Sequence, residues 1–162
     1  MKHNCIASAL AAFLLFSSLA FAGERVAVWP KGKMPHRQEN QIAAMTDEAA
    51  QKGFKADKHR TAYIEWYDAP KADVRNGACM ILISGGGYNS CCDVKLVAGW
   101  AEKLTALGFQ CVNFVYRTPR PTGLPIWQTA WEDGQRAVRI VRKDAEKRGF
   151  DPEKIGTISM SA

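Results

Sequence analysis

The stretch ACMILISGGGY, residues 78–88, contains the strongest information about the fold. Residues 78–83 form an unbroken apolar run of strand length, which is typical of a strand buried on both faces of a parallel sheet. Three consecutive glycines follow, and glycine adopts backbone conformations that other residues avoid. The stretch therefore predicts a buried strand that ends in a tight loop.

Helical and extended patterns alternate after this stretch. Apolar residues between positions 94 and 107 recur at helical spacing, and Gly108 is placed to end that helix. Residues 109–115 predict a strand, residues 129–147 a second helix and residues 155–158 a further strand. This alternation indicates an α/β fold with a doubly wound, mostly parallel sheet. The loops that follow the strands would then gather at one edge of the sheet, where such folds place their sites.

The sequence pattern is clear from residue 63 onward and less regular before residue 61. Residues 63–67 alternate and are rich in aromatics, which predicts a strand. Upstream, residues 38–52 could form a helix that Gly53 ends, although its apolar face is thin. We therefore divide the chain into residues 1–22, an N-terminal segment over residues 23–60, and an α/β domain over residues 61–162.

The first 22 residues differ from the rest of the chain. Lys2 gives a positive start, an apolar run extends from about Ile6 to Phe21, and Ala20-Phe21-Ala22 is the small-x-small pattern that signal peptidase recognises. This pattern predicts a signal peptide and a secreted or periplasmic protein with no stable membrane insertion after cleavage. The alternative is an uncleaved membrane anchor, but the run is shorter than the roughly 20 residues needed to cross a bilayer.

Composition and charge indicate an ordinary globular protein. Hydrophobic residues make up 47% of the chain and charged residues 23%, an ordinary globular balance without the signature of a disordered protein. The formal net charge of +6 falls by one when Lys2 is removed. Positively and negatively charged side chains are interleaved in residues 142–147, as on the solvated face of a helix. We therefore expect no nucleic-acid partner.

Four cysteines remain after signal cleavage: Cys79, Cys91, Cys92 and Cys111. An oxidising compartment permits disulfides, but the spacing leaves their pairing open. Cys79 and Cys111 lie in apolar runs and are predicted to be buried thiols. The Cys91-Cys92 pair lacks the spacing of a zinc site, so we expect neither a metal nor a cofactor. A bridge from this pair to a segment beyond residue 162 remains an alternative.

The glycine loop, residues 84–88, is the first candidate for chemistry. Backbone N–H groups without a neighbouring Cβ can stabilise an oxyanion that develops during acyl transfer, or they can hold a phosphate. The Gly-Lys-Ser/Thr ending of a P-loop is absent, and the spacing does not fit a GxGxxG pattern. An oxyanion loop and a simple tight turn remain as the two interpretations.

The second candidate is ISMSA, residues 158–162, directly after a predicted strand. A strand that leads into small-x-Ser-small is typical of the start of a nucleophile elbow, with Ser161 as the nucleophile. Ser159 stands where glycine is usual in such an elbow. Taken alone, a Ser-x-Ser run is also typical of a solvated loop.

The glycine loop, the segments that follow it and the ISMSA segment occur in an order that resembles the α/β-hydrolase superfamily. The closest resemblance is to the esterase/lipase branch that includes acetyl-xylan and feruloyl esterase-like proteins, which act on plant polysaccharides. The resemblance covers roughly residues 61–162. The matching segments are Gly85–Tyr88, Tyr116-Arg117, Asp133–Ala137, Val141-Arg142 and Gly149–Gly156.

The resemblance implies that Ser161 is the nucleophile and that the N–H groups of Gly86, Gly87 and Ala162 form the oxyanion hole. The expected function is a secreted serine hydrolase that cleaves a small-molecule or polysaccharide ester, for example acyl groups on plant polysaccharides, through an acyl-enzyme. The family's triad acid and histidine follow the nucleophile. We therefore expect this chain to be the N-terminal part of a domain, with a sheet incomplete on its C-terminal side, inactive alone and marginally stable.

Two other functions remain open. A serine peptidase can have the same fold, because substrate choice depends largely on loops outside this half of a hydrolase domain. A degenerate hydrolase that binds carbohydrate without catalysis could keep the glycine loop. His36 and His59 precede the nucleophile, so we interpret them as surface histidines rather than bases.

Two further pairs of side chains give structural expectations. Asp133 stands at a predicted helix start and is expected to pair with Arg117. Trp127 and Trp131 could line an acyl or sugar pocket, since aromatic rings stack on sugars, but packing in the core is the favoured interpretation.

Overall fold

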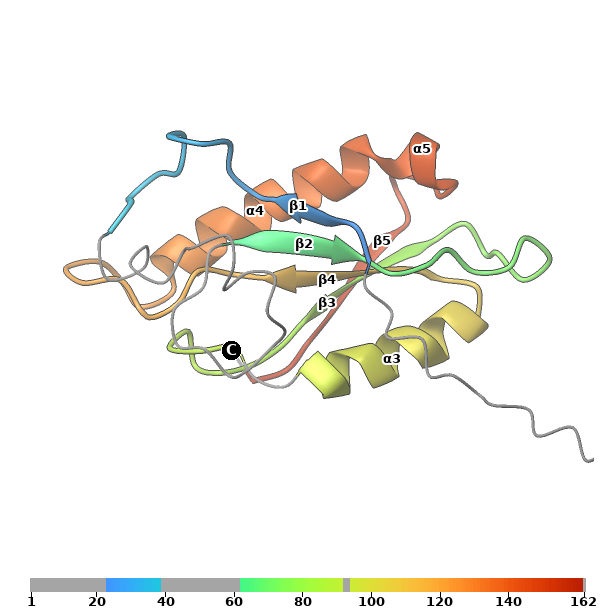
Figure 1. The fold of residues 1–162 in the computed structure, drawn as a ribbon, viewed down its shortest axis with the longest axis horizontal. Helices are drawn as coiled ribbons and strands as arrows, with labels where there is room; N and C mark the ends of the chain where they lie inside the picture. Colours follow the sequence, from blue (N-terminus) through green and yellow to red (C-terminus); the bar gives the residue numbers. More distant parts are fainter. Residues whose placement is uncertain (1–22, 39–61, 92–93, 162) are drawn as a thin grey trace, which may run out of the picture.

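The chain forms a mixed five-stranded sheet with helices on both faces, as the computed structural model of residues 23–38, 62–91 and 94–161 shows (Figure 1). The spatial order of the strands is β1-β2-β4-β3-β5. Their bounds are Arg25–Ala27 for β1, Tyr63–Trp66 for β2, Cys79–Ile83 for β3, Gln110–Val115 for β4 and Ile155–Ser159 for β5. The helices are α3 (Val94–Ala106), α4 (Gln128–Lys143) and α5 (Ala145–Arg148). The predicted α/β fold is confirmed.

Several sequence predictions concern positions outside the described residues. These are the signal peptide over residues 1–22, all but the first residue of the helix expected over residues 38–52, and the individual residues His59, Cys92 and Ala162. Among the helices that the described part of the chain contains, none is long and apolar enough to cross a membrane.

The sheet has a parallel and an antiparallel part. Strand β3 pairs in parallel with β4 on one side and with β5 on the other. Strand β2 pairs antiparallel with β4, and β1 antiparallel with β2. The prediction of a mostly parallel sheet therefore describes β4, β3 and β5, while the sheet as a whole is mixed. Antiparallel strands need no helical crossover, and the described connection over residues 67–78 contains no helix.

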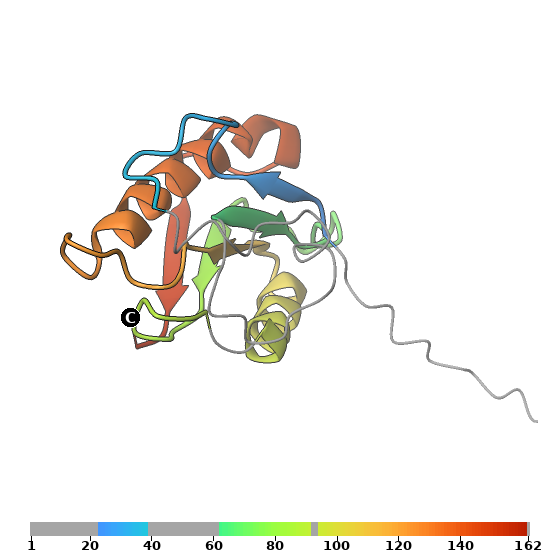
Figure 2. The ribbon, with the colours of Figure 1, turned by 60° about the vertical axis from the view of Figure 1, so that its left-hand side comes forward.

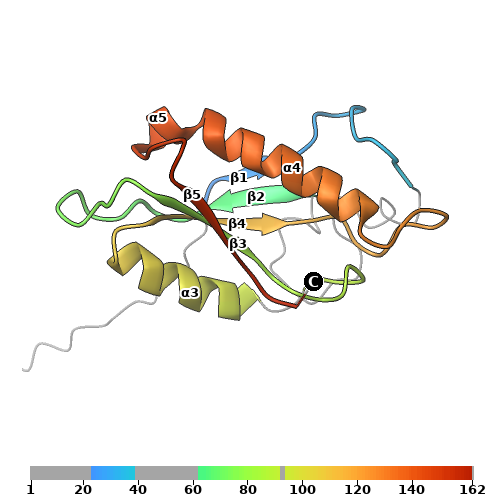
Figure 3. The same cartoon turned by 180° about the vertical axis from the view of Figure 1, so that it is seen from behind.

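The helices cover opposite faces of the sheet (Figures 1 and 3). On α4, Ala137 and Val141 are buried, as the helical spacing predicts, and Ala145 continues this stripe on α5. The second helix, predicted as one element, is interrupted at Asp144. Gly149 follows with a φ of 76°, a left-handed conformation that ends the helix without steric cost.

The three described cysteines are buried, and Cys79 and Cys111 are free thiols. Cys79 and Cys111 lie fully inside the core, which confirms the prediction. Burial raises the pKa of the Cys79 thiol to about 12 and also raises that of Cys111. The Cys91 thiol donates a hydrogen bond to the carbonyl of Tyr116 at 3.5 Å.

Candidate active site

The glycine loop and Ser161 lie together because their strands are neighbours. Ile83, the last residue of β3, is in register with Ser159, the last residue of β5. The segments that follow β3 and β5 therefore leave the sheet side by side, at the carboxyl ends of the parallel strands (Figure 2). The backbone N–H of Met160 also donates to the carbonyl of Ile83 at 3.3 Å. The structure thus brings together the two segments that the sequence singles out.

Gly85 makes the closest approach between the loop and the elbow. A Cβ at this position would lie 2.6 Å from the carbonyl oxygen of Met160 and 3.0 Å from the Cβ of Ser161. The first distance is shorter than real Cβ contacts allow, and its partner is backbone, which does not yield easily. Only glycine therefore lets the loop pack this closely against Ser161.

Ser161 itself has an unusual backbone conformation. Its φ is 64°, in the left-handed region that serine rarely adopts. Among the described residues other than glycine, only His36, Tyr88 and Ser161 have a positive φ, so two of the three lie in this site. Residues held in such conformations concentrate at functional sites. The side chain is also exposed, so a substrate can reach the hydroxyl.

The carbonyl groups of Gly86 and Gly87 accept hydrogen bonds that fix the conformation of the glycine loop. The N–H groups of Asn89 and Ser90 donate to the carbonyl of Gly86 at 3.0 and 3.2 Å. The side-chain Nε of Arg120 donates to the carbonyl of Gly87 at 2.8 Å. With both carbonyls engaged, the peptide planes of the loop are fixed. The φ angles of Gly86 and Gly87, 137° and 57°, also favour glycine.

Arg120 is a site residue that the sequence reasoning missed. It lies in a Pro-rich loop 33 positions after Gly87, and no local pattern links it to the glycines. Ala162, the third residue predicted for the oxyanion hole, lies outside the described residues, so its role stays a prediction.

Replacing Gly85 with alanine is expected to lower the free energy of unfolding by about 1–3 kcal/mol, because the new Cβ meets the Met160 carbonyl. Gly99, within α3, is the matched control because a Cβ there meets nothing within 4 Å. Gly99→Ala is expected to raise stability by about 0.5–1 kcal/mol through helix propensity. Urea unfolding followed by circular dichroism measures both changes. Equal effects of the two substitutions would contradict the close packing at Gly85.

A buried ion pair links the loop after β4 to α4. The Nε of Arg117 donates to the Asp133 carboxylate at 2.9 Å, and the backbone N–H of Arg117 donates to it at 2.9 Å. The indole N–H of Trp29 is a further donor at 2.6 Å. Both charged side chains are fully buried, so the predicted pair is confirmed. Burial raises the pKa of Asp133, against the opposing effect of these donors.

The two histidines differ in what the structure shows of them. The His36 side chain is 49% exposed, which confirms its interpretation as a surface residue. Its Nδ1 lies 2.6 Å from the carboxylate of Glu132, which also pairs with Arg117 at 3.2 Å. His36 therefore belongs to the ion-pair cluster around α4 rather than to the loop beside Ser161.

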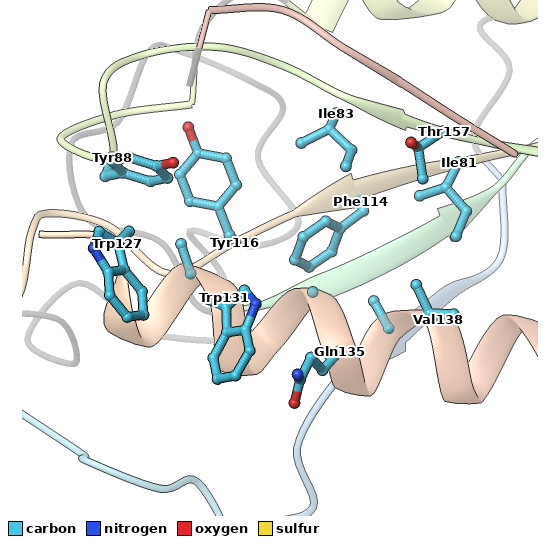
Figure 4. A pocket seen from close by; sticks show the side chains of 13 residues that line it. Ile81, Ile83, Tyr88, Phe114, Tyr116, Trp127, Trp131, Gln135, Val138 and Thr157 are labelled. Atoms are coloured by element: carbon cyan, nitrogen blue, oxygen red, sulfur yellow. The ribbon is translucent and has the colours of Figure 1, made fainter. Parts of the chain in front are cut away.

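The two tryptophans line a pocket instead of packing in the core. Trp127 and Trp131 are 45% and 55% exposed, and their rings meet edge to face with centroids 6.0 Å apart. They lie beside Tyr88 and Tyr116 along a cavity of about 460 Å³ (Figure 4). The favoured prediction of core packing is therefore wrong for the described structure. The local sequence does not reveal this, because it shows neither how far α4 stands from its neighbours nor what covers it.

Known proteins share this fold. No protein-family model matches the chain. A stretch of 84 residues, 52% of the chain, is 33% identical to endo-1,4-beta-xylanase B of Butyrivibrio fibrisolvens and covers 13% of that protein. An acetyl ester-xyloside bifunctional hydrolase from Caldicellulosiruptor lactoaceticus matches 90% of the chain at 23% identity and a TM-score of 0.55, over 45% of its own length.

Two further solved structures are similar over a shorter part of the chain. The esterase Est2 of Thermogutta terrifontis matches 66% of it at 21% identity and a TM-score of 0.52, over 39% of its own length. The α/β hydrolase MGS-M1, from a deep-sea metagenome library of the Medee basin, matches 64% at 19% identity and a TM-score of 0.50, over 43% of its length. The chain thus has the fold of α/β-hydrolase esterases, as the resemblance predicts, and spans less than half of each of these structures.

Proposed function

We propose that these residues belong to a serine hydrolase of carboxylic esters. The observation that carries the proposal is the position of Ser161, which follows the parallel strand β5, has a left-handed φ and packs against Gly85. A serine on such a turn presents its hydroxyl above the sheet, next to the backbone N–H groups of the preceding loop. Esterases and hydrolases among the structural neighbours support the same reaction class.

In the proposed reaction, the Ser161 hydroxyl attacks the acyl carbon of the ester, and the alcohol leaves. The N–H groups of Gly86, Gly87 and Ala162 stabilise the negative charge that develops on the acyl oxygen. Water then hydrolyses the acyl-enzyme and frees the serine. The general base and its orienting acid would come from a part of the protein outside these 162 residues. Because an unactivated serine hydroxyl is a weak nucleophile, we expect the 162 residues alone to be inactive.

The proposed substrate class is acyl esters of plant polysaccharides. It is supported by the names of two similar proteins, an acetyl ester-xyloside hydrolase and a xylanase. The predicted signal peptide over residues 1–22 supports a secreted or periplasmic location, where such polymers or their fragments are met. The substrate would then be a small acylated sugar or an acylated polymer, with no cofactor.

A fluorophosphonate probe tests the proposal on the protein translated from the reading frame that continues through codon 162, which we refer to as the longer protein. We expect covalent labelling of Ser161, complete loss of label in Ser161→Ala, and undiminished label in Ser159→Ala. The longer protein should also release acetate from acetylated xylan. Binding of xylan without labelling would instead indicate a non-catalytic carbohydrate-binding protein. Labelling with cleavage of peptides and not esters would indicate a peptidase.

A further inference from the structure

The glycine loop contains a tight turn with a strained central residue. The carbonyl of Gly86 accepts hydrogen bonds from the N–H of Asn89, three positions further on, and from that of Ser90. The two central residues, Gly87 and Tyr88, have φ angles of 57° and 63°. A turn with a positive φ at both central positions is of type I′. Glycine adopts this conformation freely but tyrosine rarely does, so a further interaction must hold Tyr88 in it.

The turn has a less strained alternative. Reversing the direction of the central peptide, which joins Gly87 to Tyr88, converts a type I′ turn into type II′. The tyrosine then has an ordinary negative φ, while the same hydrogen bond from Asn89 still closes the turn. In that alternative the Gly87 carbonyl points to the opposite side of the loop. The direction of this one carbonyl therefore decides which of the two turns is formed.

Arg120 fixes the direction of that carbonyl. Its Nε donates a hydrogen bond to the Gly87 oxygen at 2.8 Å, and a charged donor makes such a bond stronger than one between neutral groups. A Cβ on Gly87 would lie 3.3 Å from the Nη2 of Arg120, so the guanidinium also lies against the backbone of the turn. A type II′ turn would lose this hydrogen bond. Arg120 therefore stabilises the strained turn relative to the relaxed one.

The loop that carries Arg120 is itself anchored. Arg120 is exposed, but Thr118 and Pro121 on either side of it are buried. One residue further on, Thr122 exchanges two hydrogen bonds with the side chain of Gln38. The Thr122 N–H donates to Oε1 at 2.7 Å, and its carbonyl accepts from Nε2 at 2.9 Å. Exposed arginines often contribute little because ordering the side chain costs entropy, but here the backbone that presents the guanidinium to the turn is fixed.

We propose that Arg120 is a positioning residue of the active site, which keeps the Gly87–Tyr88 peptide in the orientation that catalysis uses. In this orientation the rings of Tyr88 and Tyr116 pack with centroids 5.9 Å apart. The Tyr116 hydroxyl also donates to the carbonyl of Ser90 at 3.3 Å, at the end of the turn. In this role Arg120 acts through the glycine loop rather than on the substrate. Its effect on rate rests on the proposed ester hydrolysis, whereas the orientation of the peptide does not.

Steady-state kinetics of the longer protein test the effect on rate. If the peptide reverses in Arg120→Ala, only the fraction of molecules that keeps the type I′ turn is competent, with or without bound substrate. We therefore expect kcat for p-nitrophenyl acetate to fall about tenfold or more, with KM within about threefold of that of the unsubstituted protein. Arg120→Lys keeps a charged donor and should recover part of the loss. Arg139→Ala, which removes an exposed arginine from α4, is the matched control and should leave kcat unchanged.

A double-mutant cycle separates the orientation of the turn from other effects of the arginine. Glycine at position 88 has a positive φ without strain, so Tyr88→Gly removes the reason for the peptide to reverse. In the Tyr88→Gly background we expect Arg120→Ala to lower kcat by no more than about threefold. An equal loss in both backgrounds would overturn the proposal, because Arg120 would then act on the substrate or on folding.

A crystal structure of the Arg120→Ala variant of the longer protein tests the orientation without reference to activity. We expect the Gly87 carbonyl to point away from position 120 and the φ of Tyr88 to become negative. An unchanged type I′ turn would overturn the proposal. The role of Arg120 and the ester hydrolysis fail in different ways. Absence of fluorophosphonate label at Ser161 in the unsubstituted protein would contradict ester hydrolysis, and the crystal structure would still decide the role of Arg120.

Discussion

Replacing Arg117 with leucine is expected to lower the free energy of unfolding by about 3–5 kcal/mol. Leucine removes the guanidinium that neutralises Asp133. The carboxylate stays fully buried and still accepts hydrogen bonds from the backbone N–H of residue 117 and from the Trp29 indole N–H. Breaking a buried pair on one side costs this much because the other charge is left uncompensated. The loss is a large fraction of the 5–15 kcal/mol that stabilises a typical domain. Urea unfolding of the longer protein measures it.

Two further variants separate the ion pair from other effects of the substitution. Arg139→Leu removes an exposed arginine from α4, the helix that carries Asp133, and we expect the free energy of unfolding to change by no more than about 0.5 kcal/mol. The double variant Arg117→Leu/Asp133→Leu removes both charges and should recover part of the loss. If Arg117→Leu instead left the melting temperature unchanged and slowed acylation of Ser161, Arg117 would act in the active site and not as a structural tie.

The sequence predicts the parallel part of the sheet well because buried strands require runs of apolar residues, which can be recognised in the sequence. Residues 79–83 are largely buried in the structure and entirely apolar in the sequence. Residues 110–115 are buried throughout and are apolar apart from Gln110 and Asn113. The antiparallel part is less predictable. Strand β1 is three residues long with Arg25 and Ala27 exposed, and neither its pairing partner nor its direction follows from its sequence.

The position of the candidate site was also predictable, for a topological reason. Parallel neighbouring strands end at the same edge, so the loop after β3 and the turn after β5 had to meet. The contacts that shape the site were not predictable. The hydrogen bond from Arg120 to Gly87 joins residues 33 positions apart. Glycine is required at position 85 because a Cβ there would clash with the carbonyl of Met160, 75 positions away. Such contacts arise from packing and leave no local pattern.

The tryptophans show a different limit. The sequence places Trp127 and Trp131 near the start of an amphipathic helix, which is compatible with either a core or a pocket position. Which of the two occurs depends on the element that faces them. In the described structure that position is open, so both rings are about half exposed.

Replacing Ser161 with alanine is expected to have the largest effect on activity, a fall in kcat for ester hydrolysis of about 10⁴-fold or more in the longer protein. The hydroxyl is the only group that forms the acyl bond in the proposed mechanism, and alanine removes it while keeping Cβ against Gly85. Stability should change little, because Ser161 is exposed, although its left-handed φ is strained for both residues. Hydrolysis of p-nitrophenyl acetate and urea unfolding measure the two quantities on the same preparation.

Ser159→Ala is the matched control, because it removes a serine hydroxyl from the same short segment, at the last residue of β5. It should leave kcat within a fewfold of the unsubstituted protein. The pair of variants distinguishes covalent catalysis from simple stabilisation of the oxyanion. If Ser161→Ala kept a tenth of the activity or more, the loop N–H groups would be acting on a nucleophile from elsewhere, such as water. The left-handed turn at Ser161 would then serve the close packing with Gly85 and the direction of the following chain rather than the chemistry.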